Sequence, residues 1–335
     1  MRPVLALTQG DPAGIGPEIL LKLFVDAPEP SGWRPLLVAE RAALEALRPV
    51  LPGFPWHRLR YLAAPPSRDE VAAGDLPVLD PVGVRRAVTF GSSGPADAAG
   101  AMAALDAGIS LVRSGAADAL VTAPVSKASI ARHHLPGFTG HTEYLAAACG
   151  LERYGRDYLM AFLAPDLQVA LLNVHLPLRA ALDGITGEAV GEALDCLHRY
   201  AGGRIALAGL NPHAGEGGLL GEEEDRVLVP AVAAARERGL DVQGPESADS
   251  LFSRARRGEF DWVLALYHDQ GLIAVKTASF GLATNWTLGL PFLRTSVDHG
   301  TAFALAGRGI ADAGPLQAVV ETTLKLIAGE LPKRR

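Results

Sequence analysis

The sequence predicts an α/β protein with mostly parallel sheets whose strands are covered by helices on both faces. Short apolar runs such as PVLALT, DALVTAP and DWVLAL alternate with helical patterns along nearly the whole chain. These runs are continuous rather than alternating, which is typical of strands buried on both faces. The length of 335 residues and the hydrophobic content of 49% favour two lobes with substantial cores.

One pair of apolar runs departs from this rhythm. YLMAFLAP and LQVALLNV are too close together for a crossover helix, so we expect an antiparallel hairpin and a partly mixed sheet. The clearest helix lies near residues 222–239, with acidic residues in its first turn and with arginines near its end that are followed by Gly239. Residues 49–80 are rich in proline, which favours loops with short strands.

Composition excludes several classes of function. The formal net charge of -6 provides no basic footprint for nucleic acid or for an anionic membrane surface. The N-terminal apolar run is too short for a signal peptide, and no segment is long enough to span a membrane, so we expect a cytoplasmic protein. Cys149 and Cys196 lack metal-site or disulfide spacing and are expected to be reduced core residues.

Three histidines follow apolar runs that resemble buried strands. They are His175 in LLNVHLPLR, His213 in LAGLNPHAGEGG and His268 in LALYHDQG, where the strand is expected to end in a loop. Since ligands of open α/β sheets collect at the carboxyl ends of strands, the three imidazoles could converge on a divalent metal. Alternatively, each histidine separately ends a strand or forms hydrogen bonds within its loop.

Polar residues near these histidines suggest further roles. The glycines of HAGEGG permit close approach of a ligand or a mobile lid. Asp269 could orient a ligand histidine, act on a substrate, or simply form a turn. His141 and Thr142 in FTGHTEYL precede a helical pattern, whose free N–H groups would suit a carboxylate or phosphate. Thr142 could also serve only as a helix cap.

Two more segments contain candidate anion or phosphate sites. Lys276, Asn285 and Arg294 are spaced through an otherwise apolar stretch, where cationic side chains are costly unless they reach solvent or an anionic partner. The glycine-rich LTQGDPAGIGPE lacks the GxGxxG spacing because Ile19 stands at the third glycine position. As an isolated glycine motif it is therefore weak evidence for phosphate binding.

Long motifs in a fixed order resemble one enzyme family. GDPAGIGPE, FTGHTE, GLNPHAGEGG, YHDQG and TLGLPFLRTSVDHGTAFALAGRGIAD are similar to segments of 4-hydroxythreonine-4-phosphate dehydrogenases, the pyridoxine-biosynthesis enzymes. GDPAGIGPE and DHGTAFALAGRGIA resemble isocitrate and isopropylmalate dehydrogenases more distantly. The resemblance implies two α/β/α lobes of the isocitrate/isopropylmalate dehydrogenase type, with the active site in the interlobe cleft. Trp286 departs from the family, which has a small aliphatic residue there.

The resemblance also implies a domain division. Residues 1–130 with 278–335 would form a discontinuous nucleotide-binding lobe. Residues 131–277 would form the lobe that binds metal and substrate and that makes a homodimer, with residues of both subunits completing the site.

Site roles are implied residue by residue. The metal ligands would be His175, His213 and His268. The substrate-binding residues would be His141, Thr142, Lys276, Asn285 and Arg294. The nicotinamide nucleotide, NAD or NADP, would meet Asp298, His299, Gly300 and Thr301. The candidates for the catalytic proton acceptor are Asp269, Asp249 and Lys127.

The implied reaction is the oxidation of 4-phosphohydroxy-L-threonine to a 3-oxo acid, which decarboxylates to 3-amino-2-oxopropyl phosphate during pyridoxal 5'-phosphate biosynthesis. One divalent cation (Zn, Mg or Co) would assist both steps. Oxidation of D-threonate or D-erythronate 4-phosphate is the alternative, because the motifs do not separate these substrates. A hydrolase with three histidine ligands and Glu216 as base would need no nicotinamide, and a phosphometabolite sensor would bind its ligand without turnover.

Overall fold

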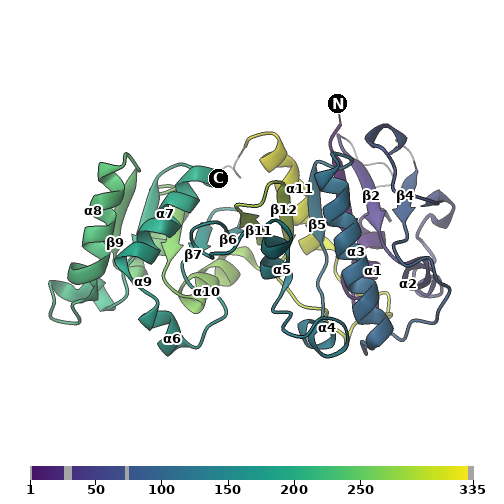
Figure 1. Cartoon of the computed structure of the whole chain (residues 1–335), viewed down its shortest axis with the longest axis horizontal. Coiled ribbons are helices and arrows are strands. Elements are labelled where there is room, and N and C mark those ends of the chain that lie inside the picture. The colour runs from purple at the N-terminus through teal and green to yellow at the C-terminus, as the bar shows by residue number, and fades with distance from the viewer. Residues whose placement is uncertain (1, 26–31, 72–74, 331–335) are drawn as a thin grey trace. The chain divides into compact units, whose positions relative to one another are not determined.

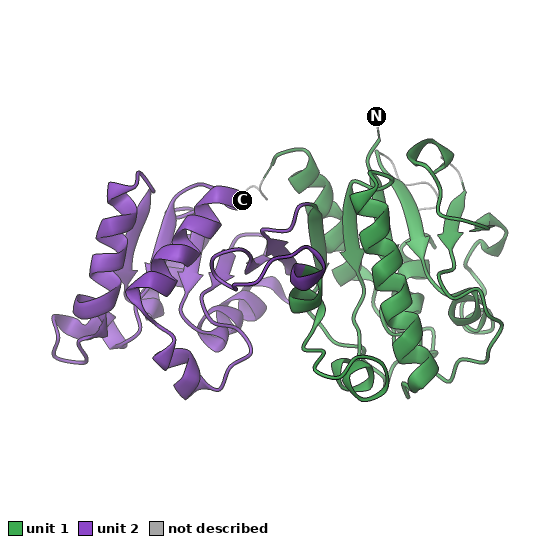
Figure 2. Ribbon diagram, viewed as in Figure 1, with its two compact units in different colours: residues 1–145, 292–331 green, residues 146–291, 332–335 purple. Residues whose placement is uncertain are grey.

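The computed structural model describes residues 2–25, 32–71 and 75–330, and the chain divides into two compact units (Figures 1 and 2). Unit 1 comprises residues 1–145 and 292–331, and unit 2 comprises residues 146–291 and 332–335. The chain therefore crosses between the units after residues 145 and 291, whereas the sequence analysis placed the crossings after residues 130 and 277. The first crossing falls within the helix α5 (His141–Ala148).

Unit 1 contains an all-parallel sheet with the strand order β3-β4-β2-β1-β5-β12. The chain builds outward from β1 in one direction through β2 and in the other through β5, so a topological switch point lies between β1 and β5. Ligands of such sheets bind outside the carboxyl ends of the strands near this point. The strands are β1 (Val4–Thr8), β2 (Arg34–Val38), β3 (Leu59–Leu62), β4 (Leu76–Leu79), β5 (Ala119–Thr122) and β12 (Leu293–Val297).

The helices of unit 1 cover strands that are buried along their length. The long α3 packs against β1 and β5, and α11 packs against β5 and β12. The short β3 and β4 confirm the loops and short strands expected from the proline-rich stretch, in which residues 72–74 lie outside the described residues. The helices are α1 (Gly16–Lys22), α2 (Arg41–Glu45), η1 (Trp56–Arg58), η2 (Arg68–Glu70), α3 (Pro95–Arg113), α4 (Lys127–His133) and α11 (Gly314–Ile327).

Unit 2 contains a mixed sheet with the strand order β11-β6-β7-β10-β8-β9. β6 pairs antiparallel with β7 and with β11, which confirms the predicted hairpin. From β7 to β9 all pairs are parallel. The strands are β6 (Leu159–Leu163), β7 (Gln168–Leu171), β8 (Ile205–Ala208), β9 (Val242–Glu246), β10 (Trp262–Ala265) and β11 (Thr284–Leu288).

The helix expected over residues 222–239 begins with a π-helical turn, η4 (Glu224–Leu228), and continues as α8 (Val229–Glu237). Gly239 follows with φ 89°, which only glycine adopts at no steric cost. The remaining helices of unit 2 are α6 (Leu178–Asp183), α7 (Gly187–Ala201), η3 (Pro212–Glu216), α9 (Ala248–Arg256) and α10 (His268–Ser279).

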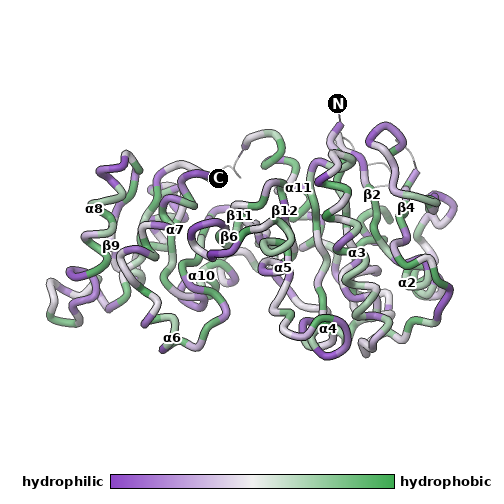
Figure 3. The backbone as a smooth tube through the Cα atoms, viewed as in Figure 1, coloured by the Kyte–Doolittle hydropathy of each residue, from purple (hydrophilic) through white to green (hydrophobic). Residues whose placement is uncertain are grey.

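Each unit has its own hydrophobic core. One core contains Leu5, Leu37 and Val121 of unit 1, and the other contains Val169, Val263 and Leu272 of unit 2. Hydrophobic stretches follow the strands of both units in Figure 3. Within the described part of the chain, no helix combines the length and apolarity needed to cross a membrane.

Candidate functional site

Three candidate metal ligands follow three neighbouring strands of unit 2. β7, β10 and β8 lie side by side and run parallel, so their carboxyl ends meet at one edge of the sheet. His175 follows β7, His268 follows β10 and His213 follows β8. The sheet topology thus brings residues that are far apart in sequence to the edge where α/β proteins bind ligands.

The imidazole rings of His175 and His268 are neighbours. Their centroids lie 5.7 Å apart, and the ring planes are tilted by 43°. The sequence predicted that His268 lies in a loop. In the structure it is instead the first residue of α10. Oδ1 of Asp269 lies 2.8 Å from Nδ1 of His268. Because Nδ1 contacts Asp269, Nε2 of His268 is the ring nitrogen that could bind a metal ion. Carboxylates orient metal-binding histidines in this way.

The loop that carries His213 has a left-handed backbone. Within η3, φ is 53° at His213, 51° at Ala214 and 46° at Glu216. Non-glycine residues rarely adopt these angles, which cost on the order of 1–3 kcal/mol each and cluster at ligand sites. The sequence signal for this feature was the glycine-rich HAGEGG, although it did not predict that the strained residues would include the histidine itself.

A buried carboxylate holds this loop in place. Glu224 is 2% exposed, and its Oε1 accepts the backbone N–H groups of Leu210 and Asn211, both at 2.7 Å. The side-chain amide of Asn211 donates to the other oxygen at 2.9 Å. A Cβ on Gly215 would lie 3.0 Å from that oxygen, so glycine allows the loop to close over Glu224. In the sequence, Glu224 was recognisable only as one of the acidic residues at the start of a predicted helix.

Side-chain amides connect the three strand ends. Asn173 donates to the carbonyl of Leu266 at 3.1 Å and so joins the end of β7 to the end of β10. Gln270 accepts the N–H of Leu266 at 2.7 Å and donates to the carbonyl of Gly209, after β8, at 2.7 Å. These two residues were not among the predicted site residues, although both lie within the histidine motifs LLNVHLPLR and LALYHDQG.

The chemistry of this edge fits a divalent cation in part. Two imidazoles bound to one ion at about 2.0–2.1 Å have ring centres roughly 5–6 Å apart, which agrees with His175 and His268. Across residues 2–25, 32–71 and 75–330, no group of three His, Cys, Asp or Glu side chains is close enough to hold an ion. His213 lies at the same edge of the sheet, but its role as the third ligand stays a prediction.

Two of the candidate proton acceptors line one cavity of unit 2. Asp249 on α9 and Asp269 on α10 face a space of about 760 Å³ that Tyr267 and Gln270 also line. The hydroxyl of Ser247 donates to Asp249 at 2.7 Å, and this bond is the largest cause of the lowered pKa of Asp249. A lowered pKa makes Asp249 a weaker proton acceptor.

A group of cationic and polar side chains lies in unit 1, around the start of α5. Arg294 on β12 is 2% exposed and donates to the hydroxyl of Thr122 at 2.7 Å. Burial lowers the pKa of Arg294 to about 9, while the carboxylate of Glu143 opposes that shift. An arginine in this state remains charged at neutral pH. The buried charge therefore creates a positive potential that suits a phosphate or a carboxylate.

Burial and the positive charge of Arg294 both affect the pKa of His141. Burial lowers the pKa of His141 well below 6.5, and the positive charges of Arg294 and Lys127 lower it further. Its Nε2 is buried and has no hydrogen-bond partner among the described residues. A neutral imidazole with one unsatisfied nitrogen can bind a polar group of a ligand. Thr142, the next residue, is 4% exposed in the first turn of α5.

The other two predicted substrate residues lie in unit 2. Lys276 is on α10, and its side chain is exposed. Asn285 is on β11, and its Oδ1 is buried without a hydrogen-bond partner among the described residues. The neighbouring Trp286, the departure from the family pattern, packs against the fully buried Trp262 with ring centroids 6.4 Å apart. Trp286 thus serves the packing of unit 2.

The predicted nucleotide segment, Asp298 to Thr301, follows β12 at the carboxyl edge of the unit 1 sheet. The GDPAGIG loop lies beside it, because the N–H of Ile15 donates to the carbonyl of Thr301 at 3.0 Å. Asp11 is fully buried, and burial raises its pKa. The GDPAGIG loop is thus packed against protein along part of its length, and its glycine spacing stays weak evidence for phosphate binding.

Comparisons with known proteins agree with this architecture. The family model described as "Pyridoxal phosphate biosynthetic protein PdxA" matches residues 33–323. A 4-hydroxythreonine-4-phosphate dehydrogenase from Chromobacterium violaceum is 45% identical, with 99% of each chain covered.

Solved structures of dehydrogenases share the fold of this chain over nearly its full length. A 4-hydroxythreonine-4-phosphate dehydrogenase from Klebsiella pneumoniae has a TM-score of 0.84 at 33% identity and covers 97% of this chain and 99% of its own. A terephthalate 1,2-cis-dihydrodioldehydrogenase from Burkholderia xenovorans has a TM-score of 0.62 at 25% identity, covering 98% and 99%. The fold is therefore shared by dehydrogenases with different substrates.

Proposed function

We propose that this chain, which belongs to the PdxA family of pyridoxal phosphate biosynthetic proteins, oxidises 4-phosphohydroxy-L-threonine with NAD or NADP. Its relatives are named as dehydrogenases of that substrate, and they align with the chain over nearly its full length. The product would be a 3-oxo acid that decarboxylates to 3-amino-2-oxopropyl phosphate. This reaction belongs to the biosynthesis of pyridoxal 5'-phosphate.

The observation that carries the proposal is the placement of His175, His268 and His213 after three adjacent parallel strands. These residues would hold one divalent cation, whether Zn, Mg or Co, with His175 and His268 already at a suitable separation. When bound, the cation supplies Lewis acidity toward the hydroxyl that is oxidised and toward the carbonyl that forms. Asp269 would keep His268 in the tautomer that presents Nε2.

Unit 1 would contribute the binding of anionic groups. The buried guanidinium of Arg294 would attract the phosphate or carboxylate of the substrate. His141, neutral at physiological pH, would orient the substrate through its unsatisfied Nε2, with Thr142 beside it. The family resemblance also implies Lys276 and Asn285 as substrate-binding residues. Such positioning matters because hydride transfer requires close alignment of donor and acceptor carbons.

When bound, NAD or NADP supplies a hydride acceptor, and a basic side chain of the protein would take the proton of the hydroxyl that is oxidised. Asp269 is engaged with His268, and Asp249 has a lowered pKa. Lys127 is the third candidate, and it could accept the proton only as the neutral amine. It begins α4, next to the group that contains His141, and its ammonium group would lie 3.2 Å from a Cβ on Gly140.

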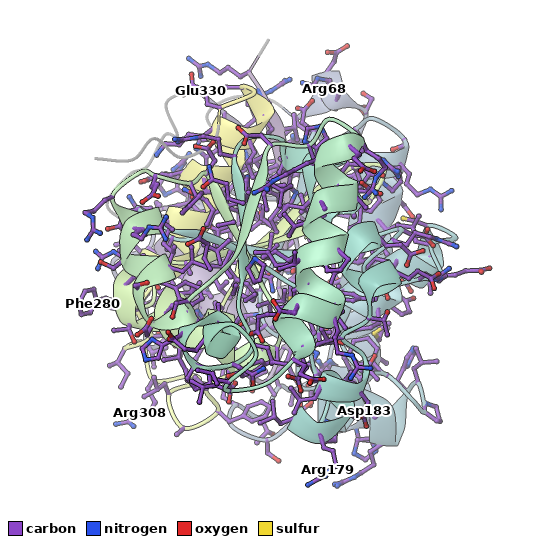
Figure 4. The ribbon with its side chains drawn as sticks, turned by 90° about the vertical axis from the view of Figure 1, so that its left-hand side faces the viewer. Arg68, Arg179, Asp183, Phe280, Arg308 and Glu330 are labelled. Carbon is purple, nitrogen blue, oxygen red and sulfur yellow. The ribbon has the colours of Figure 1, made fainter. Side chains whose placement is uncertain are left out.

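A homodimer is part of the proposal, as the resemblance implies. Exposed apolar side chains support it, among them Phe280, which is 90% exposed and projects from the surface in Figure 4. The motifs are also compatible with D-threonate or D-erythronate 4-phosphate as substrate. A hydrolase with three histidine ligands is not favoured, because the family is one of dehydrogenases.

The test is a steady-state assay of NAD+ and NADP+ reduction with each of the three hydroxy-acid phosphates. We expect the highest kcat/KM with 4-phosphohydroxy-L-threonine, loss of turnover after chelator treatment and recovery with Zn, Mg or Co. A higher kcat/KM with threonate or erythronate phosphate would change the substrate assignment. Undiminished turnover after complete removal of divalent ions would contradict the metal site.

A further inference from the structure

Two charged residues of α1 hold a distant segment of unit 1 by its backbone. The carboxylate of Glu18 accepts the N–H of Ala311 at 2.7 Å and that of Gly309 at 3.2 Å. The ammonium of Lys22 donates to the carbonyls of the same two residues, at 2.7 Å and 2.8 Å. Glu18 and Lys22 also form an ion pair of 3.2 Å. Glu18 thus accepts hydrogen bonds from the N–H groups of the segment, and Lys22 donates hydrogen bonds to its carbonyls.

The pair is buried enough to fix that geometry. The side chain of Glu18 is fully buried and that of Lys22 is 20% exposed. A buried carboxylate is costly to desolvate unless its oxygens are hydrogen-bonded. Here two N–H groups and an ammonium satisfy it, so its favourable state requires residues 309–311 in this one conformation. The network accounts for the glutamate in the GDPAGIGPE motif, to which phosphate binding gives no role.

Close packing holds the rest of the segment between Thr301 and Ala311, which contains no helix or strand. A Cβ on Gly307 would overlap the ring of Phe90, and one on Gly309 would lie 2.5 Å from the carbonyl oxygen of Val50. The conformation of these residues therefore depends on contacts with other parts of unit 1 rather than on secondary structure of their own.

The other side of the segment is open to solvent. Leu305 is 38% exposed and Ile310 is 56% exposed. Arg308 points away from the ribbon in Figure 4. The backbone of this segment is fixed by contacts on its buried side. Its exposed apolar side chains suit the flat base of a nucleotide, and the nearby cation suits the phosphates. The segment continues directly from the proposed cofactor residues Asp298 to Thr301.

We propose that Glu18 and Lys22 are positioning residues for the nicotinamide nucleotide: they touch no cofactor atom, but they hold residues 309–311 in the conformation to which the cofactor binds. The inference rests on the proposed cofactor role of residues 298–301. A protein whose competent conformation is only partly populated binds its ligand more weakly by that fraction. Loss of the contacts of Glu18 or Lys22 should therefore raise the Kd for the cofactor and leave kcat at saturating cofactor nearly unchanged.

Two variants test this inference in the full-length protein. Lys22→Met keeps the aliphatic stem and removes both carbonyl contacts, and Glu18→Gln keeps the shape and removes the charge. Lys325→Met, at an exposed position of α11, is the matched control. Calorimetric titration with NAD+ and NADP+ gives Kd, and hydrogen exchange of the cofactor-free protein reports on residues 301–312. Steady-state kinetics separate kcat from the KM for the phosphorylated substrate.

For Lys22→Met we expect a Kd for the nucleotide about tenfold higher, as when the competent conformation falls to about a tenth of its population. Exchange in residues 301–312 should accelerate, while kcat at saturating nucleotide and the KM for substrate remain within about twofold of wild type. If Glu18→Gln fails to fold, Lys22→Met decides the matter. An unchanged Kd, or a fall in kcat with unchanged Kd, would overturn the positioning role. Absence of nucleotide binding by the wild-type protein would instead overturn the proposed function on which this role rests.

Discussion

The ring centroids of His175 and His268 lie 5.7 Å apart, although the two residues follow different strands and are remote in sequence. Parallel pairing of β7 with β10 places their strand ends side by side, and the bond from Asn173 to Leu266 holds these ends together. This pair is the best-defined part of the candidate metal site. It also allows the role of each histidine to be tested separately.

Replacement of either histidine should abolish turnover through loss of the metal. We expect His268→Ala and His175→Ala to lower kcat/KM by more than about 100-fold, beyond the effect usual for residues that only support a ligand. The bound divalent ion, measured by elemental analysis after dialysis, should fall in parallel. His198→Ala, at an exposed position on α7, should retain both activity and metal. Normal metal content in both site variants would contradict their role as ligands.

The contact between Asp269 and His268 predicts a milder defect. Asp269→Asn should weaken metal affinity by about 10–100-fold, because the carboxylate orients the ligand histidine. Activity should then return when excess divalent metal is added to the assay. A loss of kcat that persists at saturating metal would mean that Asp269 acts directly as the proton acceptor.

The depressed pKa of His141 predicts a pH dependence of stability. The unfolded chain binds a proton at this residue near pH 6.5, whereas the folded protein does so only well below that pH. Its contribution to stability is therefore complete above about pH 6.5 and is lost as pH falls toward the folded-state pKa. The loss is about 1.4 kcal/mol per pH unit within that window.

A comparison with His141→Gln isolates this contribution. Chemical denaturation between pH 7 and pH 5 should show a smaller decline in the free energy of unfolding for the variant than for the wild-type protein, by roughly the amount that linkage predicts. Parallel declines in the two proteins would show that His141 is not desolvated as the structure indicates. His133→Gln, on the exposed end of α4, serves as the control for general effects of removing a histidine.

Two glycines at helix starts should respond oppositely to the same substitution. A Cβ on Gly16 would overlap the carbonyl oxygen of Gln9, whereas one on Gly187 would have no neighbouring atom within 4 Å. Gly16→Ala should therefore destabilise the protein by about 3 kcal/mol. Gly187→Ala should be neutral or stabilise it by a few tenths of a kcal/mol to about 1 kcal/mol. Thermal and urea unfolding measure both effects, and equal stability of the two variants would refute the packing role of the GDPAGIG loop.

Sequence patterns were most informative where one local signal decides the structure. Continuous apolar runs gave the parallel strands, and the short connection between Leu163 and Gln168 gave the antiparallel hairpin. The same patterns misplaced His268 in a loop, because residues after Tyr267 continue as a helix that packs on β7 and β10. The π-helical turn before α8 was also missed, since one extra residue in a turn leaves almost no periodic trace.

Amino-acid order alone therefore determined the fold class, the strand ends that carry histidines and the family, because hydrophobic periodicity and long motifs are local properties of the chain. Tertiary structure decided which of these residues meet. The pairing order of β7, β10 and β8 and the hydrogen bonds of Glu18 and Lys22 to residues 309–311 join segments remote in sequence. The hydrogen bonds of Glu224 fix the nearby loop that carries His213. The physical reason is that a buried polar group must find its hydrogen-bond partner wherever the packed chain provides one, and sequence spacing carries no record of that choice.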